Sequence, residues 1–141
     1  MPILLALLLI ALATPLDADP CEDRFRAGLA ANAGFESGVH RVETALFAGL
    51  GWVTAPELLA RLERQSALTT ACDELAGHRR ALDTAGALRQ DATRNFDLAA
   101  VLCHGLNRER AQQNVDSLGA RGVDLHDLTD FLDRVARTCR E

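Results

Sequence analysis

The spacing of apolar residues along the chain predicts helices and no strands. Apolar positions recur every third or fourth residue, and no stretch alternates apolar and polar residues with the β-branched enrichment that strands favour. The clearest stripe belongs to a last helix capped by Asp124 and consists of Leu125, Leu128, Leu132, Val135 and Cys139. The opposite side of this helix carries His126, Asp130, Asp133 and Arg137. We therefore predict an all-α fold whose last helix packs by one face.

The first half of the chain carries two further helix signals. A first helix is expected to begin at Pro20 with Asp19 as its cap, and to break near Gly34. Its apolar face is formed by Cys21, Phe25 and Leu29. A second helix is predicted over residues 37–48, and the segment Gly49–Trp52 supplies the turn after it. The core-facing residues of this second helix are expected to be Val39, Val42, Leu46 and Leu50.

The strongest local helix signal is the sequence TAPE at residues 54–57. Thr54 can accept a hydrogen bond from the backbone of Glu57 while Glu57 reaches back to the backbone of Thr54, and Pro56 is tolerated in a first turn. The third helix is expected to run from here to Gly86, with a bend or stop at Gly77. Its apolar positions are Leu58, Leu62, Leu68, Cys72, Leu75 and Leu82.

A fourth helix is predicted to start near Asp91 and to end at Gly119–Gly122. Its buried stripe is expected to comprise Phe96, Ala99, Leu102, Cys103 and Leu106. Short connections make sequential helices antiparallel neighbours. The chain is therefore predicted to form an up-and-down antiparallel bundle of four or five helices, stapled by two disulfides.

The first eighteen residues have the features of an export signal. The apolar run Ile3–Ala13 is eleven residues long, whereas a helix needs about 20 apolar residues to cross a bilayer. Leu16–Ala18 is the expected cleavage site, although no Lys or Arg precedes the run. A retained helix is disfavoured because the run has no polar face. We expect a secretory signal peptide over 1–18 and a single helical domain over 19–141.

Charge and composition exclude several partners. The net charge is −5, and all 15 basic residues are Arg, scattered in runs no longer than the pair Arg79–Arg80. Nucleic-acid binding requires clustered cations, so no nucleic acid is expected. Pro20 before Cys21 is a poor context for lipid attachment, so no stable membrane anchor is expected after signal cleavage. The location is expected to be secreted or periplasmic.

Four cysteines lie beyond the expected cleavage site, and an even number in an exported chain predicts structural disulfides. Folding about residues 86–91 brings Cys72 level with Cys103, which leaves Cys21 to pair with Cys139, and we favour this arrangement. Folding about Arg121 instead pairs Cys103 with Cys139 and Cys21 with Cys72. This second arrangement stays open.

No motif for catalysis, metal or cofactor binding is present. The histidines lack the spacing of metal ligands on one helix face; they are His40, His78, His104 and His126. Met1 is the only methionine, so a non-covalent haem lacks its usual axial Met. The sequences CxxC, CxxCH, GxSxG and SxxK do not occur. We expect no catalytic residues, no metal, no cofactor and no enzyme activity.

Two classes of function remain. The first is an exported binding or interaction module of the inhibitor, immunity or envelope-adaptor kind, whose partner is another exported or envelope protein. The alternative is a small-ligand or metal carrier that uses the bundle interior. This alternative requires a set of polar side chains to point inward together, namely Gln65, His78, Arg79, His104 and Arg110.

The export signal makes a direct prediction. Amino-terminal sequencing of the exported protein is expected to start within a few residues of Asp19, because the apolar run is short and Ala18 is a suitable small residue at the cut. Finding Met1 retained on a soluble exported protein would contradict the signal peptide.

Overall fold

The computed structural model describes residues 19–47, 60, 63–64 and 72–140. Within these ranges the protein is all-helical, with no strand. The three long helices are α1 (Pro20–Phe47), α3 (Leu75–Leu102) and α4 (Gly105–Thr138). The predictions made for the leader, the Gly49–Trp52 turn and the TAPE cap lie outside the described residues.

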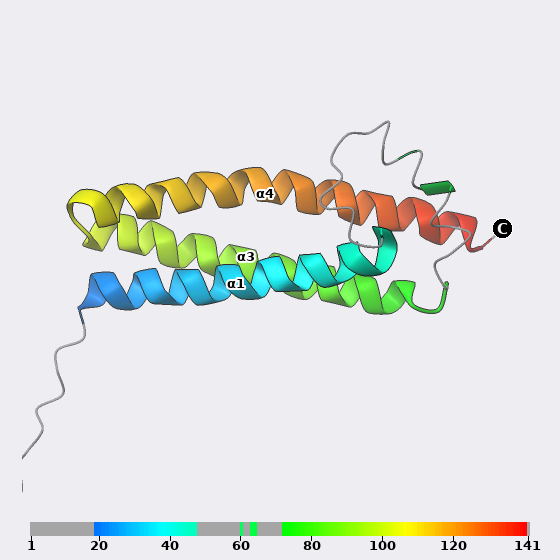
Figure 1. Cartoon of the computed structure of the whole chain (residues 1–141), viewed down its shortest axis with the longest axis horizontal. Helices are drawn as coiled ribbons and strands as arrows, with labels where there is room; N and C mark the ends of the chain where they lie inside the picture. The colour runs from blue at the N-terminus through cyan, green and yellow to red at the C-terminus, as the bar shows by residue number, and fades with distance from the viewer. Residues whose placement is uncertain (1–18, 48–59, 61–62, 65–71, 141) are drawn as a thin grey trace, which may run out of the picture.

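The three helices form an elongated antiparallel bundle (Figure 1). α3 runs against both α1 and α4 and packs on both, whereas the backbones of α1 and α4 hardly approach each other. The start of α1 and the turn between α3 and α4 lie at one end of the bundle. The all-α, disulfide-linked architecture is confirmed, and the predicted count of four or five helices is not established by these three.

The start of α1 lies where the sequence predicts it, and the predicted break at Gly34 is wrong. The Oδ1 atom of Asp19 accepts a hydrogen bond from the backbone N–H of Cys21 at 3.0 Å, which is the expected cap. The helix continues through Gly34 because this glycine packs against Leu88 of α3. Tertiary packing of this kind outweighs the ~1 kcal/mol that a glycine costs inside a helix.

The predicted helix ends in the second half of the chain are also wrong. α3 passes through Gly86 and Asp91 without a break, and α4 passes through Gly119–Gly122. The turn lies instead at Cys103 and His104, followed by Gly105 with a φ of +55°, a left-handed conformation that glycine adopts without strain. One long α3 therefore replaces the end of one predicted helix and the start of the next.

Close contact between α1 and α3 depends on glycines. A Cβ atom placed on Gly28 would lie 2.9 Å from the ring of Phe96, and one placed on Gly38 would lie 3.3 Å from the Cβ of Ala85. The ring of Phe96 is fully buried and meets Phe25 edge-on, with centroids 5.5 Å apart. The absence of a side chain at these positions lets the two backbones approach closely.

Many predicted core residues are buried, and the exposed exceptions are Leu29 on α1, Cys72 before α3, and Leu102 and Leu106 beside the α3–α4 turn. The predicted core positions Leu50, Leu58, Leu62 and Leu68 lie outside the described residues. The confirmed members are Val39, Val42, Leu46, Leu75, Leu82, Phe96, Ala99, Cys103, Leu128, Leu132 and Val135. Leu29, Leu102 and Leu106 were expected inside but are 47%, 44% and 67% exposed. Because the chain turns at residues 103–104, Leu102 and Leu106 fall at a helix end. Phe35 and Phe131 are core residues that the pattern did not single out.

Two disulfides link the helix ends, but neither predicted pairing is correct. Cys21 bonds to Cys103, and Cys72 bonds to Cys139. The favoured pairing assumed a turn at residues 86–91, and the second arrangement assumed a turn at Arg121. Because α3 runs unbroken to Leu102, its end meets the start of the antiparallel α1, and Cys72, three residues before the start of α3, meets the end of α4.

The close contact of Gly28 with Phe96 predicts that alanine substitutions at Gly28 and at Gly77 have opposite effects on stability. Gly28→Ala should lower the free energy of unfolding by about 1–3 kcal/mol, because the added methyl group overpacks against the buried Phe96 ring. Gly77→Ala, whose Cβ meets nothing within 4 Å, should raise it by about 0.5–1 kcal/mol through helix propensity. Urea unfolding with both disulfides intact measures both values. Equal effects of the two substitutions would contradict the close packing.

Candidate functional site

The polar residues required for an internal carrier site do not converge. Arg79, His104 and Arg110 are exposed and His78 is only half-buried, while Gln65 lies outside the described residues. Arg79 forms an ion pair with Asp133 at the surface between α3 and α4. Within the described part of the chain the interior is almost entirely apolar. The arrangement on which the carrier hypothesis depends is therefore not seen among these four residues.

The histidines and carboxylates also do not assemble into a metal centre within the described ranges. No group of three or more His, Cys, Asp or Glu side chains there is arranged to hold an ion. His126 lies 3.5 Å from Asp130 one turn further along α4, and both side chains are more than half exposed. A two-member exposed pair is typical of a solvated helix surface.

The main polar link between α1 and α4 is centred on Arg121. Its guanidinium donates two hydrogen bonds to Glu36, at 3.0 and 2.6 Å, and a third to Asp124 at 3.1 Å. It also lies 6.0 Å from the centre of the Phe35 ring. Burial lowers the pKa of Arg121, but the bonds and attraction of the two carboxylates outweigh it and raise this pKa. Asp124 lies three residues along α4 from Arg121, whereas Glu36 is distant along the chain, and the sequence analysis singled out neither contact.

Glu43 is a buried carboxylate that the sequence did not reveal. Its side chain is 4% exposed, and its Oε1 atom has no hydrogen-bond partner among the described residues. Oε2 lies 3.9 Å from Nδ1 of the exposed His40. Burial raises the pKa of Glu43, and Glu36 adds to this effect, while His40 and Arg121 oppose it. Folding therefore shifts the protonation equilibrium of Glu43 toward the neutral form.

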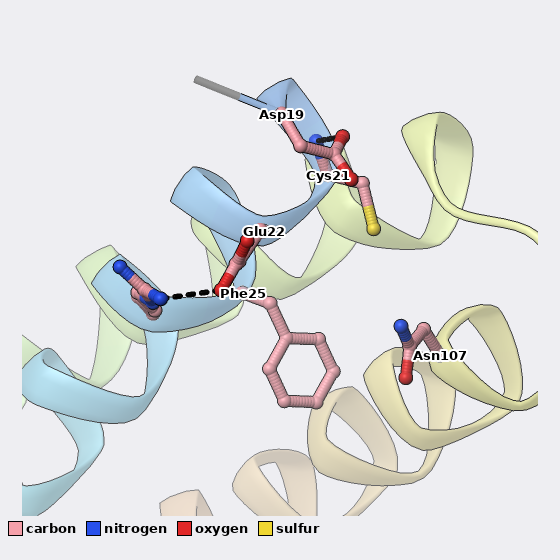
Figure 2. Close-up of a pocket in the computed structure, with 6 residues that line it drawn as sticks. Asp19, Cys21, Glu22, Phe25 and Asn107 are labelled. Atoms are coloured by element: carbon pink, nitrogen blue, oxygen red, sulfur yellow. Dashed lines mark hydrogen bonds and ion pairs between the residues drawn. The ribbon is translucent and has the colours of Figure 1, made fainter. Parts of the chain in front are cut away.

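The end of the bundle that holds the Cys21–Cys103 disulfide carries a small hollow. It measures about 280 Å³, and Figure 2 shows Phe25 of α1 facing Asn107 of α4 across it, with Asp19 and Glu22 above. Glu22 is held by an ion pair with Arg26. The acidic groups already have partners within the chain, so the hollow offers no free charged group of its own for a ligand.

Exposed aliphatic side chains gather at this same end. Three of them lie in the last turns of α3, and the fourth lies in the first turn of α4. They are Leu98, Val101, Leu102 and Leu106, whose exposed fractions are 38%, 77%, 44% and 67% in that order. We call these four residues the apolar tip. The other large apolar side chains exposed in the described chain are Leu29 and Val123. Exposed apolar side chains that lie close together are one feature of interaction surfaces, so we take the apolar tip as the candidate functional site.

Comparison with protein-family models, with curated proteins and with solved structures gives no match for the chain. Among the described helices, none is long and apolar enough to span a membrane.

The environment of Glu43 predicts that a neutral substitute at this position raises the stability of the protein, and that the increase depends on pH. Because its pKa is raised on folding, its contribution to stability is fully present below the unfolded pKa and is lost as the pH rises through the folded pKa. Glu43→Gln should therefore unfold at a higher temperature than the native chain at pH 8, and the difference should shrink toward pH 4. Thermal unfolding followed by circular dichroism measures this. The exposed Glu109→Gln serves as control, and a matching gain there would refute the role of burial.

Proposed function

We propose that this protein is an exported interaction module of the inhibitor, immunity or envelope-adaptor kind, which binds another exported or envelope protein by surface contact. The observation that supports this proposal is the sealed apolar interior of the described bundle. Phe35, Phe96 and Phe131 fill its centre with no exposed surface. Arg79, His104 and Arg110, which were considered as ligand-binding groups, lie on the outside, where they meet a macromolecule more readily than a small ligand.

Rigidity supports the same proposal. One disulfide ties the start of α1 to the end of α3, and the other ties Cys72, three residues before α3, to the end of α4. The Arg121 pairs with Glu36 add a link between α1 and α4. A preorganised surface loses little conformational entropy when it binds. A helical bundle held by disulfides is therefore well suited to binding another protein.

Site-specific photocrosslinking in the producing cell tests the proposal. A photoreactive phenylalanine analogue is placed in turn at Ala33 on α1, Ala87 on α3 and Ala120 on α4, all of which are exposed. A specific partner should give a protein adduct of one discrete mass from one face and at least fivefold less from the others. Absence of a protein adduct from all three faces, or equal smears from each, would contradict a protein-binding module.

A further inference from the structure

The two disulfides differ in how exposed their cysteines are. Cys72 is exposed and its partner Cys139 is partly buried, whereas Cys103 is 1% exposed and belongs to the core. Cys21, the partner of Cys103, is partly buried and lines the small hollow at its end of the bundle. Thiol–disulfide exchange begins when a thiolate attacks one sulfur of the bond, so the rate depends on access to that sulfur. The cysteines more open to attack are therefore Cys72 in one bond and Cys21 in the other.

The Cys72–Cys139 bond also has a suitable leaving group. Attack on Cys72 releases Cys139 as a thiolate at the partly open end of α4. Arg137 and Arg140, both exposed, neighbour Cys139 along the chain and offset the partial negative charge of the helix end. A nearby cation stabilises a thiolate, and a stabilised thiolate leaves faster. This bond can therefore open without placing a charge in the core.

The Cys21–Cys103 bond resists the same reaction whichever sulfur is attacked. Attack on Cys21 would release a thiolate at Cys103 inside the apolar core, where burial disfavours the charge. Attack on Cys103 would release Cys21 at the start of α1, which is a favourable place for a negative charge. Because Cys103 is only 1% exposed, however, an attacking thiolate cannot reach it. This bond does not combine an open sulfur with a stable leaving thiolate.

From this asymmetry we infer that Cys72–Cys139 is a thiol-exchange site, which a dithiol reductant opens while the Cys21–Cys103 disulfide stays closed. One thiolate of the reductant attacks Sγ of Cys72, so that a mixed disulfide forms and Cys139 leaves. The second thiol of the reductant then attacks its own sulfur in the mixed disulfide, and Cys72 leaves. The two protons of the reductant pass to Cys139 and Cys72, and the reductant is oxidised to one disulfide.

Buried contacts remain at this end of the bundle when the bond is open. Val135 and Phe131 have no exposed surface, and Leu75 is 5% exposed. Arg134 on α4 also forms an ion pair with Glu63 at 2.9 Å. Opening the bond therefore removes the covalent link between the end of α4 and the residues before α3, and leaves the helices packed. This reversible modification goes beyond the proposed protein contact, which uses the sides of the bundle.

Timed reduction of the exported, processed protein with dithiothreitol tests the inference. New thiols are blocked with iodoacetamide at intervals, and peptide mapping gives the fraction of each bond that has opened. Cys72 and Cys139 should be blocked about tenfold faster than Cys21 and Cys103, because only their bond has both an open sulfur and a solvated leaving group. The two bonds of one molecule control for each other. Circular dichroism of the half-reduced protein should keep the native helical signal.

A trapping variant tests the site in the producing cell and distinguishes two sources of the thiol. Cys139→Ser leaves Cys72 without its partner, so a mixed disulfide formed at Cys72 persists. A protein oxidoreductase gives a larger species on a gel that a reductant removes, whereas a small thiol gives only an added mass on the intact chain. Either product supports exchange at Cys72. Cys72→Ser is the matched control, and its less exposed Cys139 should carry several-fold less of the same product.

Three results would overturn the inference. The first is a Cys21–Cys103 bond that opens before the Cys72–Cys139 bond or at the same rate. The second is loss of the helical signal as soon as the Cys72–Cys139 bond opens, which would make that bond a structural link alone. The third is a Cys139→Ser protein whose Cys72 carries no mixed disulfide in the cell. None of these results affects the protein-binding proposal, which is tested by crosslinking on the sides of the bundle.

Discussion

The close approach of α1 to α3 is the contact on which the rest of the bundle depends. Gly28, Gly34 and Gly38 face Phe96, Leu88 and Ala85, and this row of small residues lets the two helices meet along most of their length. α3 in turn supports α4, while α1 and α4 hardly touch through their backbones. Loss of the α1–α3 contact would therefore leave α1 attached mainly by the Cys21–Cys103 disulfide and by the Arg121 pairs.

The disulfides and the Arg121 network stabilise the bundle in different ways. In a chain-entropy model, disulfides that close loops of 82 and 67 residues each stabilise the fold by about 4–5 kcal/mol, by restricting the unfolded chain. The Arg121 network acts on the folded state, and the Arg121 side chain is 20% exposed, so its bidentate pair with Glu36 is only partly screened by water. The disulfides therefore limit how far the chain can unfold, while Arg121 sets how α4 sits against α1.

Local sequence signals identified the helical class and the start of α1, but not where the helices end. Asp19 and Pro20 form a cap that depends only on neighbouring residues, and the start of α1 was predicted correctly. Gly34, Gly86 and Gly119 were interpreted as breaks because glycine weakens an isolated helix. A Cβ atom placed on Gly34 would lie 3.0 Å from Leu88, and one placed on Gly86 would lie 3.5 Å from Leu125, so neighbouring helices cover both positions. This packing is invisible in a single sequence. No such neighbour lies within 4 Å of a Cβ placed on Gly119, and the structure does not explain why α4 continues there.

The candidate site was missed for the same reason. Leu102 and Leu106 fit a buried helical stripe as long as one helix is assumed to continue through them. The turn at Cys103–His104 has no proline and a single glycine after it, so little in the sequence marked it. Because the turn was not predicted, Leu102 and Leu106 were expected in the core, whereas both are exposed at the surface. The missed turn also made the predicted cysteine pairing wrong, since both depend on where α3 ends.

The interleaved order of the two disulfides has a consequence for how the chain withstands a protease. The Cys21–Cys103 loop and the Cys72–Cys139 loop overlap along the chain. If a protease cuts any one peptide bond between Cys21 and Cys139, at least one bridge still joins the two pieces. A nicked molecule therefore keeps its mass, apart from one added water, and all of its helices remain tethered. Such damage becomes visible on a gel only after a reductant separates the fragments.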